Sequence, residues 1–123
     1  MSYSFSTIDK EDHLFFQVDG EANDLADVIA HAESIIFQAR KFKHKRLLLD
    51  ETALSMSIDT HDAILFANWF AETKVAAMGL RAAVVCAPCN RAVIRAFETA
   101  LRNRSISYKM FDDLESASEW LLK

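Results

Sequence analysis

The chain opens with two stretches in which apolar and polar residues alternate. The segment "SYSFSTI", residues 2–8, has a period of about two, and "HLFFQVDG" follows it after the acidic segment "DKED". Such alternation is typical of β-strands that bury one face. We therefore expect an N-terminal hairpin with an acidic turn, whose second strand ends near Asp19.

Three longer stretches have helical spacing instead. The first starts after Asn23 or Asp24, either of which is suited to cap a helix, and it ends in the basic segment "RKFKHKR". The second spans about residues 60–78 and stops at Gly79, a suitable C-cap. The third opens at the single proline and spans about residues 88–103. The apolar stripe of the first helix consists of Leu25, Val28, Ile29, Ala32, Ile35, Ile36 and Ala39.

Short continuous apolar runs separate these helices. "LLLD" and "RAAVVCA" are typical of central parallel strands that are buried on both faces. "ISYKMFDD" predicts a last strand, and "LESASEWLL" predicts a last short helix. The order β-β-α-β-α-β-α-β-α implies an α/β fold with a mainly parallel five-stranded sheet and right-handed crossovers. Without a linker or repeat, residues 1–123 are expected to form one domain.

Composition narrows the class of protein. The chain is 51% hydrophobic and 26% charged, as in an ordinary soluble domain. Its net charge of −4 argues against a nucleic-acid partner, since such proteins need an excess of cations. No apolar run is long enough to span a bilayer, and none follows a basic N-terminal start. We therefore expect a cytoplasmic protein without stable membrane anchoring.

With these elements in place, the chain resembles the STAS and SpoIIAA-like family, in particular its SpoIIAA-like branch of small bacterial proteins, whose functions are mostly unknown. The likeness rests on the opening hairpin, "RLLLD" ending in Asp50, "AAVVCAP" entering an Arg-containing helix, and the closing "MFDDLESASEWLL". It implies a SpoIIAA-like fold and a non-catalytic regulatory or ligand-binding module. The link of this fold to CRAL-TRIO lipid-transfer domains also implies a small apolar ligand.

The resemblance also makes Thr60 a candidate phosphosite. Anti-sigma-factor antagonists of the family are phosphorylated on a Ser or Thr that follows an Asp and lies near a glycine. Asp59-Thr60 matches that position, but its spacing from Asp50 is one residue longer and the glycine is absent. In the alternative interpretation, Ser57, Asp59 or Thr60 only caps the second helix.

The motif Cys86-Ala-Pro-Cys89 is similar to that of thiol oxidoreductases. Cys89 falls at a predicted helix start, where unpaired amides favour a thiolate. A thioredoxin fold is excluded, because only one strand and no proline follow the motif. A thiol redox sensor or oxidoreductase remains the alternative function, against a structural role for both cysteines. Zinc would need further ligands, with His61 the only near candidate, so no metal and no cofactor are predicted.

Open α/β sheets bind ligands beyond the carboxyl ends of their strands. Five residues are expected to arrive there and to form a candidate ligand crevice: Asp50, Glu51, Cys86, Cys89 and Arg91. The chain contains no Ser-His-Asp order, Gly-rich phosphate loop or zinc-protease helix. We therefore predict no catalytic residues and no enzyme activity.

The second helix is too hydrophobic for one buried face. Leu65 and Trp69 lie four residues apart on its polar side, which predicts a homodimer surface or a surface for a regulatory protein partner. Alternatively, Phe37 or a terminal segment covers them within one chain. His31 flanks the polar face of the first helix and is expected to be solvated. The expected sheet-facing residues of the second helix are Ala63, Ile64, Phe66, Ala67, Phe70, Ala71 and Met78.

Overall fold

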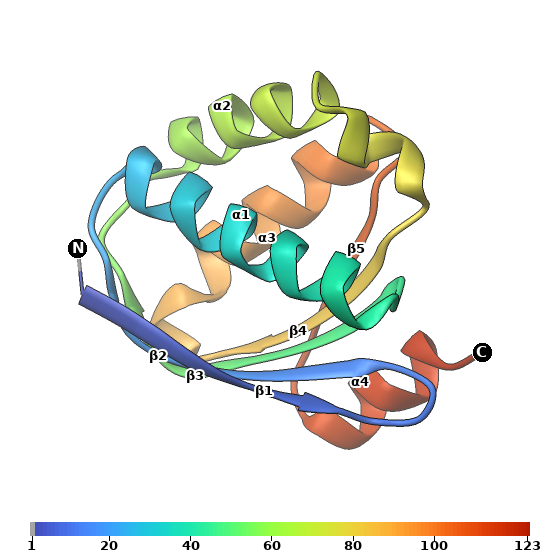
Figure 1. Cartoon of the computed structure of the whole chain (residues 1–123). Helices are drawn as coiled ribbons and strands as arrows, with labels where there is room; N and C mark the ends of the chain where they lie inside the picture. Colours follow the sequence, from blue (N-terminus) through green and yellow to red (C-terminus); the bar gives the residue numbers. More distant parts are fainter. Residues whose placement is uncertain (1) are drawn as a thin grey trace.

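A five-stranded sheet with helices on both faces forms the molecule in the computed structural model, which describes residues 2–123 (Figure 1). The strands lie side by side in sequence order. β1 (Ser2–Asp9) runs antiparallel to β2 (Leu14–Ala22). β3 (Arg46–Met56), β4 (Arg81–Cys86) and β5 (Ser107–Phe111) run parallel to β2. This confirms the mainly parallel five-stranded sheet predicted from the sequence.

The helices are divided unequally between the two faces. α1 (Leu25–Phe42), α2 (Thr60–Ala71) and α3 (Arg91–Arg102) cover one face, and α4 (Leu114–Leu121) packs against the other (Figure 1). Each of the first three helices connects neighbouring parallel strands. Because crossovers of one hand that advance in one direction leave their helices on the same side, these three helices share a face.

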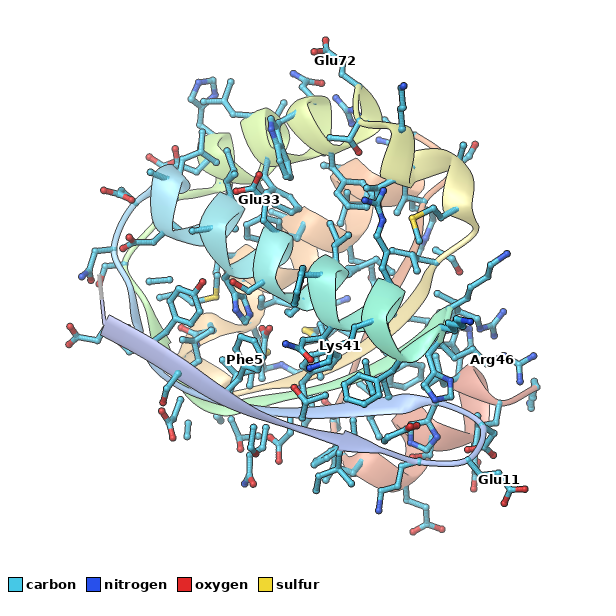
Figure 2. All side chains as sticks on the ribbon, in the orientation of Figure 1. Phe5, Glu11, Glu33, Lys41, Arg46 and Glu72 are labelled. Atoms are coloured by element: carbon cyan, nitrogen blue, oxygen red, sulfur yellow. The ribbon has the colours of Figure 1, made fainter. Side chains whose placement is uncertain are left out.

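Side chains project from both sides of the sheet (Figure 2), and the buried apolar ones form two clusters. The larger cluster lies under α1, α2 and α3, and its most deeply buried members include Phe16, Ile94 and Val84. The smaller cluster lies under α4 and consists of Leu48, Ala83, Val85, Ala117 and Leu121. Burial of alternate residues on opposite faces explains why the central strands are continuously apolar.

Aspartates cap three of the helices. Asp24 caps α1, Asp113 caps α4, and Asp59 forms a capping box with Asp62 at the start of α2. Each carboxylate accepts a backbone N–H that has no partner within the helix. The helix starts predicted at residues 23–24 and 57–60 are thus confirmed.

The second helix is shorter than predicted. α2 ends at Ala71, and a separate 3-10 helix, η1 (Lys74–Met78), follows and stops at Gly79, whose φ is 74°. The Thr73 hydroxyl donates to the Phe70 carbonyl at 2.6 Å, and the extended backbone of Thr73 interrupts the helical ladder. Glu72 projects outward at this break (Figure 2).

The third strand is longer than predicted. The apolar run "LLLD" is the interior of β3, which continues to Met56. β2 also continues past Asp19, because its backbone keeps pairing with β3 up to Ala22↔Met56. Asp50 and Glu51 therefore lie within the strand, on opposite faces of the sheet. No helix in residues 2–123 is both long and apolar enough to cross a lipid bilayer.

Candidate functional site

A cavity lies between the sheet and the three helices of the larger face. It has two chambers that share the wall residues Ala32, Ile35, Leu49, Phe66 and Tyr108. The chamber of about 80 Å³ also touches Glu51, and we call it the Glu51 chamber. The chamber of about 100 Å³ extends to Leu80, and we call it the Leu80 chamber. Almost all of the wall is hydrocarbon.

A small residue of α1, Ala32, leaves this space open. α2 and α3 pack closely, with the rings of Phe66 and Phe97 edge to face at 5.3 Å between centroids. α1 faces them with Ala32, whose side chain is too short to fill the space between the helices. A larger side chain at this position would occupy both chambers.

His31 and Glu51 meet at the wall of the Glu51 chamber. His31 Nε2 lies 3.2 Å from Glu51 Oε2, and the two residues are only 9% and 5% exposed. The edge of the Tyr3 ring packs on His31, with 4.9 Å between centroids. His31 is therefore buried, and the expectation that it is solvated was wrong, because β1 and β3 cover that side of α1.

Tyr108 is a further wall residue of both chambers. Burial raises the pKa of its phenol well above 10, and the negative charge of Glu51 raises it further. The phenol is therefore neutral at ordinary pH and is available as a hydrogen-bond donor. Glu98, which also raises this pKa, accepts the Met110 backbone N–H at 2.8 Å.

The candidate ligand crevice is only partly brought together. Glu51 and Cys86 are paired neighbours in β3 and β4, and Glu51 belongs to the cavity wall. Asp50 lies on the opposite face, where its carboxylate accepts the Thr52 hydroxyl at 2.7 Å. Arg91 forms an exposed ion pair with Asp112.

The two cysteines are free and lie in different surroundings. Cys86 is buried, with its Sγ 3.8 Å from Met110 Sδ. Burial, and next Glu51, raise the pKa of the Cys86 thiol above its ordinary value. Cys89 is exposed in η2 (Pro88–Asn90), a short 3-10 helix that precedes α3. A raised pKa is the opposite of what a redox-active thiol needs.

Thr60, Leu65 and Trp69 all lie on α2. Thr60 is its exposed first residue. Leu65 is 38% exposed, whereas Trp69 is half-buried, its ring 5.7 Å from that of Phe66. Ile64, expected to face the sheet, is 48% exposed. The buried stripe is narrower than expected, with residues 63, 66, 67 and 70 at strict helical spacing.

Two polar residues of the cavity, His31 and Tyr108, were missed by the sequence analysis. The signal for His31 was its spacing, since it lies three residues after Val28 and four before Ile35 in the apolar stripe. The signal that His31 would pair with Glu51 was the position of Glu51 directly after an apolar strand core. A carboxylate buried there needs a hydrogen-bond or charge partner. Within residues 2–123, no three His, Cys, Asp or Glu side chains cluster in a way suited to a metal ion.

The strand order, the antiparallel first strand and the helix distribution define a SpoIIAA-like α/β fold. The chain is similar to the crystal structure of an uncharacterized protein of the DUF3478 family with a SpoIIAA-like fold from Shewanella loihica PV-4. The TM-score is 0.53 over 97% of this chain and 93% of that chain, with 17% sequence identity. The fold implied by the sequence resemblance is thus confirmed. No family model and no curated protein sequence matches the chain.

Proposed function

We propose that the chain is a non-catalytic module that binds a small apolar ligand in the cavity between helices and sheet. The observation that carries this proposal is the pair of adjoining chambers, of about 80 and about 100 Å³, with hydrocarbon walls. Apolar cavities of about 150 Å³ stay dry and bind benzene, so a ligand of similar size would occupy both chambers. Concave apolar sites with few polar groups are the usual form of small-molecule sites.

The alternative function, a thiol redox sensor or oxidoreductase that uses Cys86 and Cys89, has less support. Cys86 is buried, and burial raises the pKa of its thiol, so that it remains protonated near neutral pH. Cys89 alone is exposed. A dithiol mechanism needs an accessible thiolate that attacks a disulfide sulfur and a second thiol that resolves the mixed disulfide, and only one of these thiols is accessible.

The proposal is tested by filling the cavity. Ala32→Leu should place extra methyl groups into both chambers, and Ala26→Leu makes the same change at an exposed position of α1. Methylcyclohexane should raise the melting temperature of the wild type and of Ala26→Leu, but not of Ala32→Leu. The proposal fails if the probe does not bind the wild type, or if it stabilises all three proteins equally.

We also propose that the module forms a homodimer, or binds a regulatory protein, through α2. Ile64 and Leu65 expose apolar area on this helix, and Ile64 lies one turn after Thr60. Both Thr60 and Ile64 line a groove between α2 and α3. A phosphate on Thr60 would be favoured by the helix N-terminus and would change the charge of this surface. We place this activity in the bacterial cytoplasm, where free cysteines stay reduced.

A further inference from the structure

The cavity wall includes a residue with an unsatisfied polar atom. His31 is 91% buried, and its Nδ1 has no hydrogen-bond partner among residues 2–123. Buried nitrogen atoms nearly always have a partner, because loss of hydration without a replacement costs folding free energy. His31 lines the Glu51 chamber, so a molecule that fills this chamber is a candidate partner for Nδ1.

The hydrogen bond on the other side of the ring limits the chemistry of that partner. An ionised Glu51 carboxylate only accepts, so His31 Nε2 carries the proton between them. In the neutral ring, Nδ1 then accepts a hydrogen bond, and in the imidazolium it donates one. A hydroxyl group suits both states, because it can donate as well as accept.

The field in the Glu51 chamber limits the charge of the partner. Glu51 lies in the wall, and its negative charge contributes to the raised pKa of the Tyr108 phenol. A bound carboxylate would be a second buried anion beside Glu51 and would be disfavoured for the same reason. The neutral Tyr108 phenol offers a donor to a neutral oxygen on the ligand.

We propose that the ligand is a neutral alcohol or phenol, whose hydroxyl binds His31 Nδ1 and the Tyr108 phenol. This inference rests on the proposed function. Its apolar body occupies the rest of the cavity, against Phe66 and Ile35. The two polar groups thereby set the orientation of a ligand that the hydrocarbon wall alone would not orient.

The test uses three probes with one ring size: cyclohexanol, methylcyclohexane and cyclohexanecarboxylate. In calorimetric titrations, Tyr108→Phe should weaken cyclohexanol about fivefold, as expected for one lost hydrogen bond, and leave methylcyclohexane unchanged. Tyr3→Phe removes the other phenol, which lies outside the cavity wall, and should change neither affinity.

Two further readouts test the charge and the position of the hydroxyl group. Cyclohexanecarboxylate should bind the wild type more weakly than cyclohexanol. The imidazole ¹⁵N signal of His31 Nδ1 should shift with cyclohexanol and not with methylcyclohexane.

The outcomes separate this inference from the proposed function. If methylcyclohexane binds and Tyr108→Phe leaves cyclohexanol affinity unchanged, the hydroxyl inference is overturned while the apolar cavity remains a binding site. Preferred binding of cyclohexanecarboxylate, or an unchanged His31 signal, also overturns it. If neither neutral probe binds the wild type, both proposals fail.

Discussion

A carboxylate buried in a strand needs a partner, and Glu51 of β3 has His31 of α1. This contact joins the first helix to the sheet at the wall of the cavity. Buried ion pairs are often no more stabilising than apolar residues of similar volume, whereas a single unpaired charge is strongly destabilising. The pair therefore adds little net stability over an apolar contact, although loss of one partner alone should be costly.

Substitution of the pair tests this explanation. His31→Leu leaves Glu51 buried without its partner and should lower the free energy of unfolding by about 3–5 kcal/mol. Adding Glu51→Leu removes the unpaired charge and should restore most of the loss. Urea unfolding followed by circular dichroism measures both variants. A double variant no more stable than His31→Leu would contradict this account.

The thiols should differ in reactivity. Iodoacetamide at neutral pH should label Cys89, which is exposed, much faster than Cys86, which is buried and has a raised pKa. Peptide mass spectrometry after timed alkylation distinguishes the two sites. Equal rates at both thiols in the folded protein would favour the redox alternative instead.

Because the pKa of Cys86 is raised in the folded protein, the stability of the protein should depend on pH. Near its ordinary value of about 9 the unfolded chain releases the thiol proton while the folded chain retains it. Stability should therefore fall as pH rises through that range, and Cys86→Ala should reduce this fall. Urea unfolding at pH values on both sides of 9 measures the slope, and an identical slope in the variant would contradict the prediction.

At the scale of single residues, the sequence predicted contacts between neighbours in the chain but not contacts between distant residues. The capping aspartates were predictable, because a cap depends on residues within one turn of helix. The burial of His31 was not, since it depends on Tyr3 and Glu51, which come from separate strands.

At the scale of elements, the order of strands and helices could be predicted, but not where β3 and α2 end. Apolar periodicity marks the buried centre of an element, whereas its end depends on backbone pairing and on local interruptions. β3 continues through polar residues because β2 continues beside it, and α2 stops where Thr73 is extended. The greater length of β3 changes the candidate crevice, since Glu51 lies inside the strand and lines the cavity.

The docking of α4 gives a prediction for one element. The Arg81 guanidinium of β4 stacks on the Trp120 ring at 3.9 Å and donates to the Trp120 carbonyl. Lysine cannot reproduce this planar stacking, so Arg81→Lys should destabilise the protein by about 1–2 kcal/mol and increase hydrogen exchange in α4. Arg95→Lys, at an exposed position of α3, is the control and should have little effect. Unchanged exchange in α4 would show that the stacking does not hold the helix.

At the scale of the whole molecule, the cavity is a property of the assembly. Its walls come from three helices and four strands, from Ala22 near the N-terminus to Tyr108 near the C-terminus. The sequence predicts which residues are buried, but the empty volume is a small difference between large packed volumes, which periodicity does not contain. The resemblance implied an apolar ligand, and the proposal of a ligand site rests on the apolar space found here.

The proposed homodimer is a prediction at the same scale. In a two-fold symmetric dimer the same surface meets itself, so Leu65→Glu would bring two new negative charges together and should produce a monomer. Phe37→Glu makes the same change on α1, at a residue that is 64% exposed, and should leave the dimer intact. Trp69 is less suitable for this test, because its ring packs against Phe66 and Phe70 and its loss would also weaken the core. Light scattering over a dilution series measures the mass of each protein. A monomeric wild type at every concentration, or a Leu65→Glu dimer, would contradict the proposal, whereas loss of the dimer only with Phe37→Glu would place the interface on α1.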